Sequence, residues 1–479
     1  MLKIFHDLFT ELNSSEVSFC NWKGHSTVGS HLNGGGDLDL FVSLRHKTKF
    51  EKIIEDKGFK RVISYQANHD FIEHFYGLDK ITNKFVHVHV YFKIVTGEHI
   101  SKNYILPLEH FILTDLDNSS LLPKPSVIAQ HVIFLIRYYL KIGSFYGFLQ
   151  YQREFKKYSD EWNYINDNCD YKIVEELDLS IECLNEMTGV YKAPNFLRKL
   201  FLSRNLKRKL RNYKVRSHFL YQVYVFNNFV RRLLNKWFFK KKKLFIPGIV
   251  VAVCGLDGCG KSSLVSALND NFEEHFSVKT LHVGRPKSNI LTFSFNIFIY
   301  FYSLLKRKKS LNGETNVFEA PKKISIIYAI RSVLLAYDRK IVTTNAHKLS
   351  KKGYLVICDR YPGLVVGKMD SPRISLDSNR SLVYQLCYLI EQKLYKSIKQ
   401  ANLIFHLQVP LEIAIFRNNK RKKNGKETEN ELRDRFLINS DAVFLGDNYH
   451  FFNASKPFKA VLIEATDAIW HSKAWDDTQ

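Results

Sequence analysis

The residues with the clearest chemical potential lie between positions 249 and 264, where the sequence reads IVVAVCGLDGCGKSSL. A short apolar run leads into a glycine-rich turn, and a helical pattern follows from Lys261. Glycines in such a turn let backbone N–H groups surround phosphate oxygens, and the positive end of the next helix faces the same anion. We expect Lys261 to reach the β- and γ-phosphates of ATP and Ser262 to bind Mg²⁺. The predicted nucleotide contacts are Gly255, Gly258, Gly260, Lys261, Ser262 and Ser263.

A carboxylate stands at the end of a second apolar run. Residues 353–361 read GYLVICDRY, which predicts a buried strand that ends at Asp359. Ligands of open α/β sheets bind beyond the carboxyl ends of the strands. We therefore expect Asp359 to hold Mg²⁺, directly or through water, and Arg360 to contact phosphate. The alternative for a lone aspartate at a strand end is a helix cap.

A basic segment follows a third predicted strand. Residues 403–417, LIFHLQVPLEIAIFR, predict a strand, a turn that begins at proline and a helix, and NNKRKKNGKETENELRDRF comes next. Phosphoryl transfer spreads negative charge over the transferred group, and arginines stabilise that charge. The turn LDGC has no basic residue, so we expect this segment to form a basic lid that supplies the arginine, with Arg417, Lys420, Arg421, Lys422 and Lys423 as its basic residues. The alternative is a solvated run of charge.

The elements that must position these residues divide the chain into three regions. The chain has 479 residues, enough for two or three domains, and 45% of them are hydrophobic. Residues 1–115 alternate short strands and helices, residues 120–244 have a helical pattern, and an α/β pattern spans residues 245–479. We predict an α/β protein. Its C-terminal domain is a doubly wound parallel sheet with helices on both faces, preceded by a small α+β domain and a helical middle region.

Composition indicates a reducing cytoplasm. The seven cysteines are scattered and no CxxC pair exists, which argues against zinc and against a disulfide framework. No stretch reaches the roughly 18 apolar residues of a membrane span. The N-terminal sequence MLKIFHDLFTELNSSE contains acids and no small-residue cleavage site, and we interpret it as an amphipathic helix rather than a signal peptide.

The net charge of +24 is partly concentrated between residues 192 and 243. That stretch is basic, rich in aromatic residues and contains no Asp or Glu. Such a helical stretch suits an anionic membrane surface, with nucleic acid as the weaker candidate. A solvated basic helix is the alternative. The inner face of the membrane is therefore a candidate surface for peripheral contact.

The N-terminal domain carries its own pair of carboxylates. Residues 33–42 read NGGGDLDLFV, with Asp37 and Asp39 on one face of a predicted strand. This pattern resembles the nucleotidyltransferase superfamily, and the resemblance implies that both carboxylates hold a divalent metal at a nucleotide's phosphates. The superfamily has a third carboxylate on a later strand, but the candidate strand KFVHVHVYF has His87 and His89 instead. Either the domain has lost transfer activity and serves to bind substrate, or one of these histidines replaces the missing ligand.

The motifs of the C-terminal half, taken in order, resemble the thymidylate kinase family. GLDGCGKSS resembles its phosphate loop, HVGRP its arginine–proline step, LLAYDRK its helix with an Asp-Arg pair, and VPLEIAIFR the helix before its lid. The similarity covers about 230 residues. It implies that Asp257 and Arg360 face the reacting phosphate and the acceptor, that Arg285 and Arg339 contact the acceptor, and that Tyr361 packs near it. Members of the family are commonly dimers, so the resemblance also allows a homodimer.

The departures from the family fall on the acceptor side. The arginine–proline step continues into Lys287 rather than glycine, residues 288–323 form an enlarged segment, and PGLVVGKMDSPRISL after Tyr361 is unfamiliar. Three hypotheses follow. The protein is an ATP-dependent kinase of a nucleoside monophosphate; or the same kinase acts on a sugar or glycan in bacterial surface-polysaccharide assembly; or it is a non-enzymatic, nucleotide-responsive module that binds membrane or nucleic acid.

Overall fold

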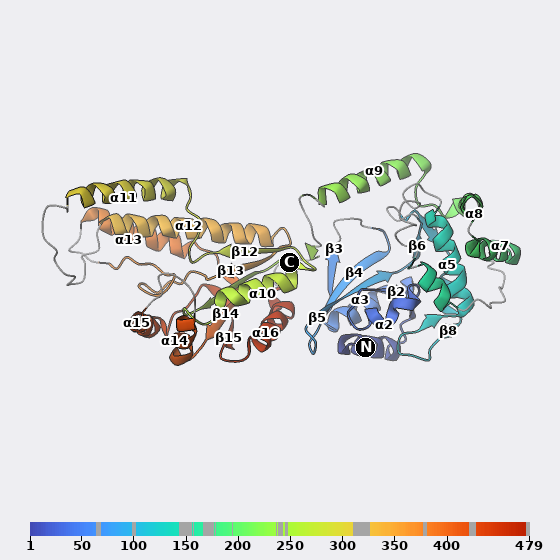
Figure 1. Ribbon diagram of the computed structural model, residues 1–479, viewed down its shortest axis with the longest axis horizontal. Coiled ribbons are helices and arrows are strands. Elements are labelled where there is room, and N and C mark those ends of the chain that lie inside the picture. Colours follow the sequence, from blue (N-terminus) through green and yellow to red (C-terminus); the bar gives the residue numbers. More distant parts are fainter. Residues whose placement is uncertain are drawn as a thin grey trace. The chain divides into compact units, whose positions relative to one another are not determined.

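The computed structural model describes residues 1–63, 69–97, 102–142, 156, 158–165, 177, 179–193, 195–235, 237, 243–244, 248–309, 326–376, 381–420 and 428–475. The chain forms two compact units, Met1–Phe245 and Ile246–Gln479 (Figure 1). The segment 120–244, which the sequence pattern sets apart, therefore lies in the first unit. Among the helices in these ranges, none combines the length and the hydropathy that a membrane crossing requires.

The N-terminal unit is built on a mixed sheet. Its strands include β1 Phe19–Asn21, β2 Asp37–Val42, β3 Lys60–Ile63, β4 Ile72–Asp79, β5 Lys84–Tyr91, β6 Ile94–Thr96, β7 Tyr104–Leu106, β8 Leu116–Asp117, β9 Lys124–Pro125 and β10 Lys243–Leu244. Its helices include α1 Lys3–Ser14, α2 Val28–His31, α3 Lys47–Asp56, α4 Glu109–Leu113, α5 Val127–Ile142, α7 Ile181–Lys192, α8 Phe196–Lys209 and α9 His218–Leu234. Six strands form one sheet in the order β1-β2-β5-β4-β3-β10. Within it, β2 and β5 are parallel and the other neighbours are antiparallel.

Apolar and polar side chains alternate along much of β2 and β5, which gives this part of the sheet an apolar face and a polar face. The valines and leucines of the two strands belong to a core shared with α1 and α3. Because successive side chains of a strand point to opposite faces, Asp37, Asp39, His87 and His89 lie on the other face. The predicted strand at KFVHVHVYF, with its valines on one face and its histidines on the other, is confirmed.

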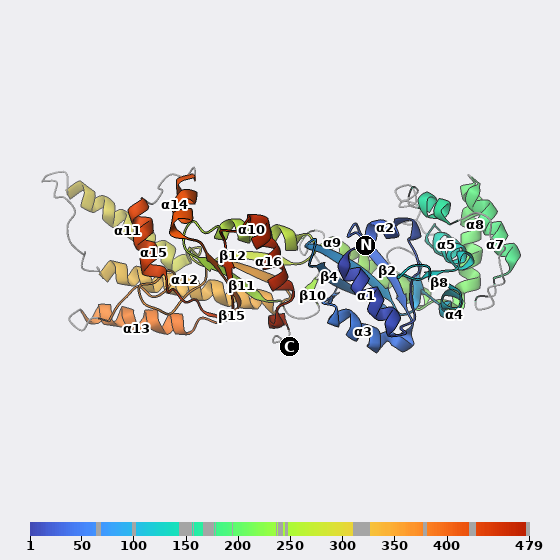
Figure 2. The same cartoon turned by 90° about the horizontal axis from the view of Figure 1, so that it is seen from below.

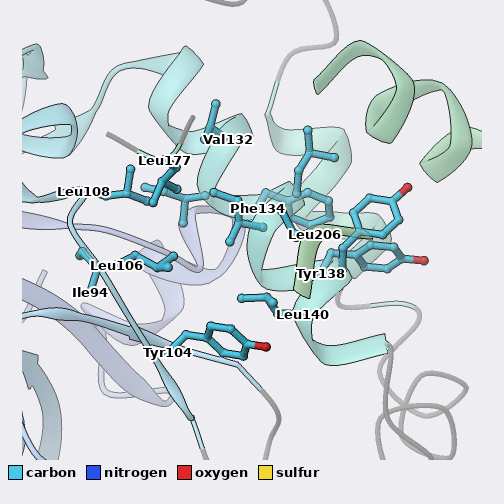
Figure 3. Packing of buried hydrophobic residues seen from close by; sticks show 14 of the residues in the cluster. Ile94, Tyr104, Leu106, Leu108, Val132, Phe134, Tyr138, Leu140, Leu177 and Leu206 are labelled. Carbon is cyan, nitrogen blue, oxygen red and sulfur yellow. The ribbon is translucent and has the colours of Figure 1, made fainter. Parts of the chain in front are cut away.

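A second core joins the sheet to the helical segment. Helix α5 is apolar around most of its circumference, so most of its residues are buried. Phe134 and Tyr138 of α5 lie close to Leu206 of α8 in this core (Figure 3). The hydroxyl of Ser203 donates to the carbonyl oxygen of Tyr139 at 2.6 Å, which satisfies a buried hydroxyl between the two helices.

The C-terminal unit is a parallel sheet between helices. Its strands include β11 Val250–Gly255, β12 Val278–His282, β13 Leu355–Asp359, β14 Ala401–Gln408 and β15 Gly446–Asn453. Its helices include α10 Lys261–Glu273, α11 Ile290–Lys309, α12 Ile326–Ser350, α13 Leu382–Lys396, α14 Leu411–Lys420, α15 Glu429–Asn439 and α16 Phe458–Trp470. The five strands run in the order β12-β13-β11-β14-β15, and all neighbours are parallel. The predicted α/β fold class is confirmed.

Helices cover both faces of this sheet, which is why its central strand is an unbroken apolar run. Val250 and Ala252 face a core that includes residues of α12 and α13, and Val251 and Val253 are fully buried on the other face. Figure 2 shows α12 and α13 side by side. In the sheet, β13 and β12 lie on one side of β11, and β14 and β15 lie on its other side. The carboxyl end of β11 is thus a topological switch point, the usual ligand site of such sheets.

Candidate active site

The turn between β11 and α10 has glycines at positions where its backbone closely approaches neighbouring elements. Gly255 has a φ of 139°, and a Cβ added there would lie 2.5 Å from the carbonyl oxygen of Leu407. Gly258 has a φ of 90°, and its Cβ would lie 3.0 Å from the carbonyl oxygen of Ala414. A residue with a side chain would strain the backbone and push β14 or α14 away. The two glycines therefore hold the turn close to the elements that follow β14.

Lys261 begins helix α10 with its side chain folded back over the turn. The residue is buried, and its Nζ donates to the carbonyl oxygen of Leu256 at 2.7 Å. The same Nζ lies 3.4 Å from Oδ1 of Asp257. The amine thus lies at the mouth of the turn, where the terminal phosphates of a bound nucleotide would meet it.

Ser262 and Asp359 meet where a metal ion would bind. The Ser262 hydroxyl donates to Oδ2 of Asp359 at 3.1 Å, because β13 runs beside β11 and pairs Val253 with Asp359. The other carboxylate oxygen, Oδ1, is buried and has no hydrogen-bond partner among the described residues. A hydroxyl and a carboxylate oxygen without a partner form a ligand set that fits Mg²⁺. Ser263 is exposed beside them in the first turn of α10.

Asp257 forms ion pairs with basic side chains at the mouth of the turn. It forms an ion pair with Arg360, and its Oδ2 accepts from Nη1 of Arg435 in α15 at 2.9 Å. Burial raises the pKa of Asp257, but Lys261, Arg360 and Arg435 outweigh it and hold that pKa below its ordinary value. The carboxylate is therefore charged at neutral pH and positions two guanidinium groups.

Arg360 is also held from its other side by Asp370. Its Nη1 lies 3.2 Å from Oδ2 of Asp370, whose Oδ1 lies 2.7 Å from Nη2 of Arg339. Arg360 and Asp370 have φ values of 70° and 58°, left-handed conformations that are uncommon for residues with side chains. Such conformations concentrate at functional sites, where the surrounding structure holds them.

A pocket of about 400 Å³ opens beside this network. Six basic residues line it: Arg285, Arg339, Arg360, Lys368, Arg373 and Arg435. The acids in the lining are Asp257 and Asp370, so the pocket has an excess of positive charge. Tyr328 and Phe436 add aromatic surface. This composition fits an anionic ligand with a planar or apolar part.

The structure brings some of the predicted residues together and separates others. Arg285, Arg339, Asp257 and Arg360 all line the pocket. Arg339 is buried and also donates to the carbonyl oxygen of Gly284 at 3.1 Å, so it holds the pocket wall as well as facing the cavity.

The remaining predicted residues lie elsewhere. Tyr361 is fully buried in the core under the sheet, where its hydroxyl donates to the carbonyl oxygen of Lys399 at 2.7 Å. Arg417 donates from Nη2 to the carbonyl oxygen of Ala454 at 2.8 Å. Neither is part of the pocket lining, and Arg421 falls outside the described residues.

Sequence reasoning did not select Arg435, Arg373 or Asp370. Arg435 lies in the basic segment after residue 417, but the sequence does not distinguish it from the other basic residues there. Two features of helix α15 in the structure do so. Helix α15 begins with a capping box at Thr428, and Arg433 is paired with Glu429 one turn earlier. Arg435 faces the pocket instead.

The comparisons with known proteins cover about half of the chain. No protein-family model matches it. An "Uncharacterized ATP-binding protein YghR" of Escherichia coli K12 is 23% identical over 229 residues, which is 47% of this chain and 88% of the relative. A "Probable thymidylate kinase 2" of Saccharolobus solfataricus is 25% identical over 182 residues, 38% of this chain and 69% of the relative.

The C-terminal half resembles P-loop ATP-binding proteins. Among solved structures, the thymidylate kinase of Candida albicans is 17% identical, covers 48% of this chain and 94% of its own, and has a TM-score of 0.27. The two sequence relatives agree with the turn at Lys261 in indicating nucleotide binding.

Proposed function

We propose that the C-terminal unit is an ATP-dependent phosphotransferase that transfers the γ-phosphoryl group of ATP to an acceptor that already carries a phosphate. The observation that supports this proposal most directly is the basic pocket, which meets the phosphate-binding turn at Asp257. The two acids in the lining already pair with Arg339, Arg360 and Arg435, but six basic residues line the pocket. A neutral acceptor would leave this excess of positive charge uncompensated. Arginine matches phosphate oxygens with two parallel hydrogen bonds.

Each residue of the site has a defined role in this proposal. Lys261 binds the terminal phosphates, and Ser262 and Asp359 hold Mg²⁺, which neutralises charge on the phosphates. Asp257 positions Arg360 and Arg435 beside the transferred group. Because the pKa of Asp257 is lowered, it is a weak base. An acceptor phosphate is already ionised at neutral pH and needs no base, which is consistent with this role.

A nucleoside monophosphate is the first candidate for the acceptor. Tyr328 and Phe436 could lie against the face of a nucleobase while the arginines bind the phosphate. A sugar phosphate or phosphorylated glycan is the second, because its phosphate fits the same arginines. A non-enzymatic nucleotide-binding module would need no such acceptor pocket beside the turn.

Matched acceptors test this proposal. ATP consumption would be measured with Mg²⁺ and with pairs of compounds that differ only in a phosphate, such as thymidylate and thymidine, or a sugar phosphate and the free sugar. We expect turnover with at least one phosphorylated member and none with its partner. Turnover with free sugars alone would contradict the assignment of the basic pocket to an acceptor phosphate.

For the N-terminal unit we propose a nucleotidyltransferase-like architecture that binds substrate and does not perform Mg²⁺-dependent transfer. Asp37 and Asp39 lie on β2, and the neighbouring strand β5 offers histidines where a third carboxylate would be needed. The acid Glu73 on β4 lies 2.7 Å from both Lys47 and Arg61. Its successor His74 points to the face of the aspartates, so Glu73 points away from them.

We also propose that α9 makes peripheral contact with an anionic membrane surface. Polar residues are buried and apolar residues are exposed along this helix. Asn228 and the C-cap residue Asn235 are 2% and 3% exposed, whereas Phe219 and Phe226 are 76% and 68% exposed. Trp237 just beyond the helix is 71% exposed. An outward apolar and aromatic face with arginines in its last turn fits the boundary between acyl chains and anionic headgroups.

A further inference from the structure

Three histidines converge on the polar face of the N-terminal sheet. His87 and His89 lie on β5, and His74 lies on the neighbouring strand β4, where the antiparallel register places it opposite His89. One ring nitrogen from each residue lies within 4.8 Å of the others. This cluster is separate from the phosphate-binding turn and belongs to a different unit of the chain.

The spacing of the ring nitrogens suits a shared ion. Nδ1 of His74 and Nε2 of His87 are 3.2 Å apart. Two imidazole nitrogens bonded to one tetrahedral zinc ion at about 2.0–2.1 Å lie roughly 3.3 Å apart. The ring of His89 stands nearly perpendicular to both other rings, with centroids 4.5 Å from His74 and 4.3 Å from His87. One ring nitrogen of His89 lies within 4.8 Å of a ring nitrogen of each of the other two histidines.

Asp37 supplies the partner that a metal-binding histidine commonly has. Its Oδ1 lies 2.7 Å from Nδ1 of His87. A proton on Nδ1 that is donated to this carboxylate leaves Nε2 unprotonated, which is the form that binds a metal. His87 is buried, and the ring is fixed further by Tyr76, stacked on it at 4.3 Å between centroids.

The aspartate pair is already occupied by other groups. Asp39 lies 3.0 Å from Nζ of Lys23 and 3.4 Å from Nδ1 of His89, and Asp37 is engaged by His87. Carboxylates held in this way are less available to Mg²⁺, which requires oxygen ligands. Imidazole nitrogens are preferred by zinc, copper, nickel and iron.

We propose that His74, His87 and His89 bind a divalent transition metal, most simply Zn²⁺, with Asp37 orienting His87. Three protein nitrogens leave a fourth coordination position. Because the side chain of His89 is 21% exposed and that of Asp37 52% exposed, this position is accessible from solvent. An anionic or water ligand could enter there. The proposal does not depend on the phosphotransferase assignment.

Metal binding by the full chain tests the proposal. The protein would be stripped with a chelator and titrated with Zn²⁺ by calorimetry, and with Co²⁺ by visible absorption. We expect one tightly bound Zn²⁺ per chain and Co²⁺ bands of the intensity typical of four-coordinate sites. Mg²⁺ at millimolar concentration should displace neither ion.

Variants assign the binding to the cluster. His74→Gln and His89→Gln should abolish stoichiometric binding, and Asp37→Asn should weaken it by roughly 10–100-fold while keeping the three imidazoles. His6→Gln, at a ring 58% exposed on α1, is the matched control and should bind as the unmodified protein does. Far-UV circular dichroism of each metal-free protein separates loss of the site from loss of fold. If His74→Gln does not fold, His89→Gln provides the test. Unchanged Zn²⁺ affinity in the folded histidine variants, or displacement by equimolar Mg²⁺, would overturn the proposal.

Discussion

At the scale of single residues, the arginines around Asp257 are the most informative feature of the candidate active site. Arg360 comes directly after a strand, so its place at the sheet edge could be predicted from GYLVICDRY. Arg435 reaches the same carboxylate from 178 positions along the chain, a separation over which no local pattern carries information. For the same reason His74 could not be assigned to the histidines of β5 before the strand register was known.

Arg435 and Arg417 give a matched pair of variants. We expect Arg435→Ala to lower kcat/KM for phosphoryl transfer by roughly 10²-fold. This is the loss typical when one fixed hydrogen-bond donor to a charge that develops in the transition state is removed. Arg417→Ala should change kcat/KM by only a few-fold, because its guanidinium is bound to the carbonyl oxygen of Ala454. Steady-state kinetics with a saturating second substrate would compare the two. A large loss for Arg417→Ala alone would show that the lid acts as the sequence pattern first suggested.

The lowered pKa of Asp257 predicts a pH dependence of stability. A carboxyl group whose pKa is lower in the folded state stabilises the fold above its unfolded pKa of about 3.9 and loses that contribution as pH falls through the folded value. At neutral pH, Asp257→Asn should therefore lower the melting temperature, since it leaves Arg360 and Arg435 with one partner fewer. The difference from the unmodified protein should shrink below about pH 4. Thermal unfolding across this range would measure it, and a difference that grows as pH falls would contradict the assignment.

At the scale of elements, the sequence predicted the strands around the turn better than it predicted which side of each helix is buried. A strand buried on both faces is an uninterrupted apolar run ended by glycine or aspartate, as at β11 and β13, and that signal is local. The side of α9 that is buried depends on what the helix lies against. Its many aromatic residues are compatible with a core, yet the buried positions include Asn228 and Asn235.

The exposed face of α9 predicts salt-sensitive binding to anionic vesicles. We expect the protein to sediment with vesicles that contain phosphatidylserine at low ionic strength and to be released as salt rises, because the attraction of the basic side chains is screened. Phe226→Asp should weaken binding. Ile81→Asp is the control, since Ile81 is also 68% exposed but lies between β4 and β5. Equal binding to uncharged vesicles, or equal loss in both variants, would refute the role of this face.

At the scale of the whole molecule, the chain combines two units with separate cores. The boundary follows a run of lysines and precedes Pro247 in the sequence, and the contacts divide the chain between Phe245 and Ile246. The middle helices could not be assigned to either neighbour from periodicity alone. Their apolar residues pack on the N-terminal sheet, as Phe134 and Tyr138 do.

Because the chain forms two units, we predict that nucleotide slows hydrogen exchange only in the C-terminal unit. ATP with Mg²⁺ should slow amide hydrogen exchange in β11 and the first turns of α10, and a ligand at 100 times its Kd stabilises the unit it binds by about 2.7 kcal/mol. Exchange in β2 and β5 should stay unchanged, because these strands belong to the other unit. Hydrogen exchange followed by mass spectrometry would resolve the two regions. Protection confined to the N-terminal unit would contradict the assignment of the nucleotide site to the turn at Lys261.

The most direct test of the central claim is the transfer of a labelled γ-phosphoryl group from ATP to an acceptor. Purified protein and its Lys261→Ala variant would be incubated with labelled ATP, Mg²⁺ and a panel of nucleoside monophosphates and phosphorylated sugars. We predict label on at least one acceptor and a loss of transfer of at least roughly 10²-fold in the variant, because alanine has no ammonium group to stabilise the transferred charge. Equal transfer by both proteins, or ATP binding without transfer to any phosphorylated acceptor, would contradict the proposed phosphotransferase.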